Sequence, residues 1–187
     1  MMAGAAMKPA PHRGRSRGFT LVELMVVLSI VAILVGLAAP QFGTMLLRSR
    51  LSAHANDAVS SALLARGEAI KRNAPVSMCV STDGAACGGS SWEQGYLVMC
   101  RTTDNSTCDE AGPSTLVLRY NRAMPGGWKM TEAASLTRVV FQPTGVGATP
   151  GAWTICRATP VGGERRQVRV SSTGRPSVTK EVSTDCA

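Results

Sequence analysis

One carboxylate inside a long apolar stretch is the side chain of this sequence best suited to a specific chemical role. Glu23 lies four residues after Phe19, and no charged residue occurs from Leu24 to Leu47. An acid within a bilayer costs about 2.5 to 3.5 kcal/mol on insertion scales, so it needs a partner. Cleavage between Gly18 and Phe19 would create an amine one helical turn away. We therefore predict that this amine, on a neighbouring parallel helix, pairs with Glu23; the alternative is that Glu23 only reaches toward the membrane interface.

The other reactive side chains form no recognisable catalytic pattern. His12 and His54 lie outside any metal-binding or acid–base motif, and neither a Gly-x-Ser-x-Gly turn nor a phosphate-binding loop occurs. We therefore expect no enzyme activity, no cofactor and no metal site.

Six cysteines are better explained as disulfides of an extracytoplasmic domain. The pattern Met-Cys-x-Ser/Thr-Thr-Asp-x-x-x-Cys occurs twice, starting at Met78 and at Met99. Because each copy has its own turn signal and its own second cysteine, two local loops are expected. The predicted pairs are Cys79–Cys87, Cys100–Cys108 and Cys156–Cys186. Pairing of Cys79 with Cys100 and a four-cysteine zinc site are the alternatives, although zinc sites use tighter spacing.

The apolar stretch that carries Glu23 is long enough to span a membrane. About 20 apolar residues cross a bilayer core as a helix, and a secretory signal has a shorter apolar region. Cleavage of an ordinary signal peptide near Ala38 is the alternative. Four basic residues and no acid precede the stretch, which places the amino terminus in the cytoplasm by the positive-inside rule. These residues are Lys8, Arg13, Arg15 and Arg17.

The helix is predicted to continue beyond the membrane, from Phe19 to Arg72. Apolar residues recur at spacings of three and four, which is typical of one buried helix face. They are Leu51, Ala55, Ala58, Val59, Ala62, Leu63, Ala69 and Ile70. Asn73-Ala74-Pro75 ends the helix because Pro75 disfavours helix at Ala74. A coiled coil is disfavoured, since no heptad is sustained.

Short β-like runs separated by turn residues follow from Val76 onward and predict an antiparallel meander. The expected strands are Val76–Ser81, Gly95–Arg101, Thr115–Tyr120, Trp128–Thr131, Arg138–Gln142, Trp153–Ala158, Arg165–Ser171 and Ser177–Val182. The predicted fold class is α+β, with a long helix packed on a β-sheet head.

The run Arg17-Gly18-Phe19-Thr20-Leu21-Val22-Glu23-Leu24-Met25 resembles the signal and helix start of type IV pilins and type II secretion pseudopilins. This resemblance implies cleavage after Gly18 by a prepilin peptidase, N-methylation of Phe19 and use of Glu23 in subunit docking. Pro40 matches the proline that bends the helix of many pilins, and its missing N–H gives that kink a physical basis.

Residues 61–73, the start of the first strand and Trp92-Glu93-Gln94-Gly95-Tyr96 resemble the GspH/FimT/FimU group of minor pilins and pseudopilins. The carboxyl-terminal tail, with its predicted Cys156–Cys186 disulfide, is more similar to FimU-type minor pilins than to secretion-system GspH. The resemblance implies a subunit that primes or caps type IV pilus assembly, with twitching motility and DNA uptake as associated processes. The alternative is a pseudopilin of a type II secretion system.

The basic carboxyl-terminal third raises a binding hypothesis. Residues 138–187 contain seven basic and three acidic residues, whereas residues 73–137 contain four and six. The residues that could contact DNA phosphates are Arg165, Arg166, Arg169, Arg175 and Lys180. Some FimT-type pilins bind DNA through Gly-Arg-x-Arg, but Gly174-Arg175-Pro176-Ser177 lacks the second arginine. A solvated basic face, or one that meets an acidic pilin, is the alternative.

These observations predict four segments in one chain. They are a cleaved leader (1–18), a transmembrane helix (19–47), an amphipathic helix half (48–73) and a β-rich periplasmic head (74–187). The expected location is the bacterial inner membrane, with the amino terminus cytoplasmic, followed by a pilus or pseudopilus. The expected partners are other pilins or pseudopilins, the prepilin peptidase and N-methyltransferase, the inner membrane and, with less support, DNA.

Overall fold

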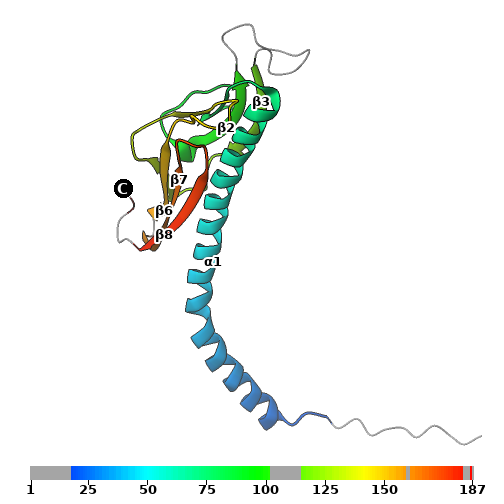
Figure 1. Ribbon diagram of the computed structural model, residues 1–187. Helices are drawn as coiled ribbons and strands as arrows, with labels where there is room; N and C mark the ends of the chain where they lie inside the picture. The colour runs from blue at the N-terminus through cyan, green and yellow to red at the C-terminus, as the bar shows by residue number, and fades with distance from the viewer. Residues whose placement is uncertain (1–17, 102–114, 159–160, 183–185, 187) are drawn as a thin grey trace, which may run out of the picture. The chain divides into compact units, whose positions relative to one another are not determined.

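The computed structural model describes residues 18–101, 115–158, 161–182 and 186. The chain divides into two units, Met1–Gly43 and Thr44–Ala187. The first contains the beginning of helix α1, and the second contains the rest of this helix and all the strands (Figure 1). The elements are α1 (Leu21–Arg72), β1 (Val76–Val80), the 3-10 turn η1 (Trp92–Gln94), β2 (Gly95–Arg101), β3 (Thr115–Arg122), β4 (Trp128–Glu132), β5 (Arg138–Phe141), β6 (Gly151–Ala158), β7 (Val161–Val170) and β8 (Pro176–Val182).

Both ends of α1 follow from local sequence. The helix starts at Leu21, two residues later than predicted, because the Thr20 hydroxyl caps it by accepting a hydrogen bond from Glu23 N–H at 3.2 Å. The Thr20 carbonyl accepts the first helical hydrogen bond, from Leu24 N–H at 3.1 Å. At the other end Asn73 adopts a left-handed φ of 49°. This conformation lets Ala74 N–H donate to the Ala69 carbonyl and Asn73 N–H donate to the Ile70 carbonyl, which satisfies carbonyls that a helix end leaves unpaired.

The eight predicted strands are present, but only β1-β2-β3 and β6-β7-β8 form the predicted meander. The head has two four-stranded antiparallel sheets, in the orders β3-β2-β1-β5 and β4-β6-β7-β8. After β3 the chain passes to the second sheet, where it forms β4. It then passes back to the first sheet, where β5 pairs with β1 and places Phe141 opposite Val76. All five residues of β1 are buried, so this strand needs a neighbour on each edge and cover on each face. It therefore lies between β2 and β5, inside its sheet.

In the second unit, α1 buries a stripe of small residues in the main core. The stripe consists of Leu51, Ala55, Ala58, Ala62, Ala65 and Ala69, each at most 2% exposed. These small side chains lie in the same buried cluster as larger side chains of the strands, such as Phe141, Trp153 and Ile155.

Three residues predicted for the buried helix face lie beside it instead. Leu63 and Ile70 are each 51% exposed, and Val59 is only half-buried. At about 100° per residue, they are roughly 80° to 120° from the centre of the alanine stripe. Ala65, which the prediction omitted, is fully buried and lies about 40° from that centre.

Disulfides connect the loops and the carboxyl terminus to the strands. Cys79 is bonded to Cys87, and Cys156 is bonded to Cys186. The first bond excludes both the Cys79–Cys100 pairing and a zinc site that needs these thiolates. Cys100 is also disulfide-bonded. Its predicted partner, Cys108, lies outside the described residues.

Candidate assembly interface

The predicted processing site is the peptide bond between Gly18 and Phe19. Gly18 and Phe19 are exposed and lie outside any helix or strand. The Thr20 hydroxyl accepts a hydrogen bond from Glu23 N–H at 3.2 Å. Thr20 and Glu23 thus have the spacing of a capping box, Thr-x-x-Glu, a local signal that the sequence prediction did not use. Because of this cap, the helix begins at Leu21, two residues after the Gly18–Phe19 peptide bond.

The Glu23 side chain is exposed, and within the described residues its carboxylate makes no recorded hydrogen bond or ion pair. A carboxylate near a helix amino terminus is favoured by the helix dipole, so its position is compatible with the helix. The carboxylate itself remains available to a group outside this chain.

The surface around Glu23 is apolar on every side of the helix. Exposed large apolar side chains occur in each turn from Phe19 to Leu37, for example Leu21 at 73% and Leu37 at 70% exposure. A helix that is hydrophobic all round must be covered by lipid or by other helices. In the first unit, this surface is the feature that most strongly indicates assembly.

Among the described residues, no single straight helix meets the length and hydropathy requirements of a membrane span. The segments Leu21–Leu37 and Phe42–Arg72 of α1 meet them as a pair, by length and composition only. The kink that the sequence predicts at Pro40 stays a prediction.

A polar cluster at the helix–sheet contact was not foreseen from the sequence. The buried Ser61 hydroxyl donates to the Asp57 carbonyl at 2.8 Å and accepts from the Asn121 side-chain amide at 3.0 Å. Beside it, the Arg119 guanidinium donates to the Ser60 hydroxyl at 2.9 Å. Burial raises the pKa of Tyr96, which hydrogen-bonds to Ser61, to about 12. These bonds fix the position of β3 along the helix.

The five basic residues predicted to contact DNA do not form one surface. In the β7–β8 register, Arg165 pairs with Glu181, and Arg166 pairs with Lys180. Because adjacent strand residues point to opposite faces, Arg165 and Arg169 lie on one face of the sheet, and Arg166 and Lys180 on the other. Arg175 is exposed in the turn between the strands.

Ion pairs also occupy most of these charges. Arg165 Nε is 2.7 Å from Glu181 Oε2. Lys180 Nζ is 3.2 Å and Arg166 Nη1 is 3.5 Å from Glu164 carboxylate oxygens. The basic composition of the tail therefore does not produce a continuous basic patch on the described head.

Comparison with known proteins identifies the family. A model described as type II transport protein GspH matches residues 54–174, more than half of the chain. The chain belongs to the GspH family. A second model, the prokaryotic N-terminal methylation motif, matches residues 13–39, which include Gly18, Phe19 and Glu23.

Similar proteins include one relative by sequence and two solved structures. The pilin-like protein PilA1 of Thermus thermophilus is 32% identical over 165 residues, which cover 85% of this chain and 96% of the relative. The crystal structure of the type IV minor pilin FimU of Pseudomonas aeruginosa matches with a TM-score of 0.50 and 20% identity, covering 71% of this chain and 90% of FimU. This likeness shows the pilin-like fold. The minor pseudopilin EpsH of the Vibrio cholerae type 2 secretion system gives a TM-score of 0.44 at 14% identity, over 69% of this chain and 95% of EpsH.

Membership of the GspH family makes the chain a minor pilin or pseudopilin, of a type IV pilus or a type II secretion system. The methylation motif and the apolar helix indicate membrane anchoring and incorporation into a pilus or pseudopilus. Among the described residues, no group of three or more His, Cys, Asp or Glu side chains is placed to hold a metal ion.

Proposed function

We propose that this protein is a minor pilin that primes or caps a type IV pilus and has no catalytic role. The observation that carries the proposal is an exposed apolar helix whose lone carboxylate, Glu23, has no recorded partner among the described residues. Before assembly, the apolar helix is held in the inner membrane, with the amino terminus in the cytoplasm and the head in the periplasm.

Maturation supplies the missing partner of Glu23. Prepilin peptidase cleaves the Gly18–Phe19 bond, and the new amine of Phe19 is N-methylated. The exposure of both residues, and their position ahead of the capped helix, support access by the peptidase. In the filament, the Phe19 amine of one subunit pairs with Glu23 of the next and sets the register between their helices.

Incorporation of Glu23 variants tests this proposal. Glu23→Gln keeps the size of the side chain and removes its charge, whereas Glu23→Asp keeps the charge. We expect Glu23→Gln to be processed normally but to disappear from sheared pili, and Glu23→Asp to be partly incorporated. Normal incorporation of Glu23→Gln would overturn the docking role.

A GspH-like pseudopilin of a type II secretion system is the second proposal, and it is supported by the description of the family model. Deletion of the gene distinguishes the two. Loss of surface pili and twitching with normal secretion supports the minor pilin. Loss of protein secretion with normal pili supports the pseudopilin.

DNA capture is the least supported proposal, because the basic residues are divided between two sheet faces and are largely ion-paired. Arg175 is the best candidate contact, since it is exposed. If Arg175→Gln lowers DNA retention while pili stay normal, capture is a genuine function of this subunit.

A further inference from the structure

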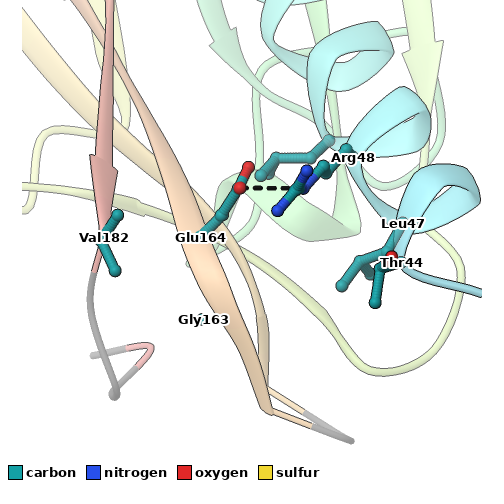
Figure 2. Close-up of a pocket in the computed structure, with 7 residues that line it drawn as sticks. Thr44, Leu47, Arg48, Gly163, Glu164 and Val182 are labelled. Atoms are coloured by element: carbon teal, nitrogen blue, oxygen red, sulfur yellow. Dashed lines mark ion pairs between the residues drawn. The ribbon is translucent and has the colours of Figure 1, made fainter. Parts of the chain in front are cut away.

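A small groove in the second unit combines an apolar lining with a cluster of positive charge (Figure 2). Its volume is about 300 Å³, and it lies between the first turns of α1 in this unit and the ends of β7 and β8. The lining residues are Thr44, Leu47, Arg48, Leu51, Gly163, Glu164 and Val182. We call it the Leu47 groove. It belongs to neither the Glu23 region nor the helix–sheet polar cluster.

One carboxylate in this groove contacts three cations. Arg48 Nε is 2.9 Å from Glu164 Oε1, the contact that Figure 2 marks with a dashed line. Lys180 and Arg166 contact the same carboxylate at 3.2 and 3.5 Å. Burial alone would raise the pKa of Glu164, but the Lys180 hydrogen bond and the three positive charges lower it, so the carboxylate is ionised near neutral pH. The cluster therefore keeps an excess of two positive charges.

The excess charge is accessible from solvent. The side chains of Arg48 and Lys180 are 61% and 55% exposed, whereas that of Glu164 is only 14% exposed. Arg48 uses its Nε for Glu164, and its two Nη groups form no recorded bond within the described residues. A guanidinium with free Nη groups is suited to phosphate, which it binds through paired hydrogen bonds.

Next to these cations, the groove is apolar. Leu51 is buried, Leu47 is half-buried, and Val182 at the end of β8 is 79% exposed. Met45 and Leu46, one turn before Arg48, are also largely exposed. Arg48 directly follows the uncharged segment Leu24–Leu47, which makes it the first charge beyond the membrane anchor.

We propose that the Leu47 groove binds the phosphate of an anionic phospholipid, with the first carbons of an acyl chain against Leu47 and Val182. The inference rests on the membrane anchoring proposed above. A lipid is favoured over a free anion because the cations adjoin apolar side chains, and because Arg48 borders the segment that contacts the bilayer. Each basic residue near a membrane surface contributes about 1 kcal/mol to binding of anionic lipid, which is about a fivefold effect.

The test is native mass spectrometry of the full chain in a neutral detergent, titrated with phosphatidylglycerol or with phosphatidylcholine of the same acyl chains. Wild type should retain phosphatidylglycerol in preference to phosphatidylcholine. Arg48→Gln with Lys180→Gln should reduce this preference by roughly 30-fold, the combined effect of two charges. Arg122→Gln with Lys129→Gln removes the same net charge from exposed positions outside the groove, and should leave the preference unchanged.

A second variant tests the groove without removing an ion pair. Val182 is highly exposed, so Val182→Asp should fold normally while adding a repelling charge, and it should also lower retention of phosphatidylglycerol. The proposal is overturned if wild type shows no preference, if both double variants lose it equally, or if inorganic phosphate at the same concentration displaces the lipid. If wild type shows no lipid preference while its incorporation into pili still depends on Glu23, this inference is rejected and the proposed function stands.

Discussion

Close packing of α1 on the head predicts a specific effect of enlarging one alanine. Ala62 is fully buried in the middle of the alanine stripe. Leucine adds three carbon atoms at a position where the helix and the strands already touch. Inserting such groups into a packed core costs typically about 1 to 3 kcal/mol. The matched control is Ala53→Leu, at an exposed position of the same helix, where the change should stay within about 0.5 kcal/mol.

The effect can be read from the thermal midpoint of the head. For a unit as long as Thr44–Ala187, an unfolding entropy of about 2.1 cal/mol/K per residue gives a shift of about 3 °C per kcal/mol. Ala62→Leu should therefore lower the midpoint by about 3 to 10 °C, and Ala53→Leu by less than about 2 °C.

Tryptophan fluorescence of the full chain in detergent is a suitable assay. The chain has three tryptophans, Trp92, Trp128 and Trp153, and all are buried in the head. Their emission therefore reports unfolding of the head and not of the membrane segment. Equal midpoints for Ala62→Leu and wild type would refute close helix–sheet packing. If Ala62→Leu and Ala53→Leu lower the thermal midpoint equally, the effect comes from the helix itself and not from its contact with the strands.

Further predictions concern the disulfides, the polar cluster and pH. Replacing Cys156 and Cys186 with serine should lower the free energy of unfolding by about 3.7 kcal/mol, against about 2.6 kcal/mol for Cys79 and Cys87, because the first pair closes the longer loop; denaturant titration that reversed this order would contradict the loop-entropy account. Ser61→Ala leaves the Asn121 amide without its acceptor and should cost about 1 to 3 kcal/mol, whereas Ser49→Ala at an exposed position should cost almost nothing. Burial lowers the pKa of His54; Asp57 opposes this shift, and Arg50 adds a smaller lowering. As pH falls below about 6.5, the histidine of the unfolded chain therefore takes up a proton before that of the folded chain does. Stability should therefore decline below that pH in wild type and decline less in His54→Asn, as measured by denaturant titration at several pH values.

The secondary structure could be predicted because its signals are local. Asn73 and Pro75 mark the helix end, and turn residues separate runs of β-forming residues. The largest strand error was at β7, which begins at Val161 and not at Arg165. Two glycines and Glu164 weaken the apolar pattern there, although the backbone pairs with β6 and β8.

Strand order could not be predicted because it depends on contacts far apart in sequence. Nothing local to Phe141 indicates that it lies opposite Val76. The pair between Arg48 and Glu164 likewise joins residues that only the fold brings together.

The division of the basic tail could have been predicted from strand alternation. Arg165 and Arg166 are neighbours in a predicted strand, so they must point to opposite faces of the sheet. The prediction of one basic surface came from counting charges along the sequence. It did not use the alternation of side chains along a strand, which was already available from the sequence.

The central claim, that an amine created by cleavage pairs with Glu23, is tested most directly by mass spectrometry of the mature amino terminus. The account predicts a chain that begins at Phe19 and carries one methyl group on its α-amine. A mature chain that begins at Met1, or at Ala39 after signal-peptide cleavage, would contradict it.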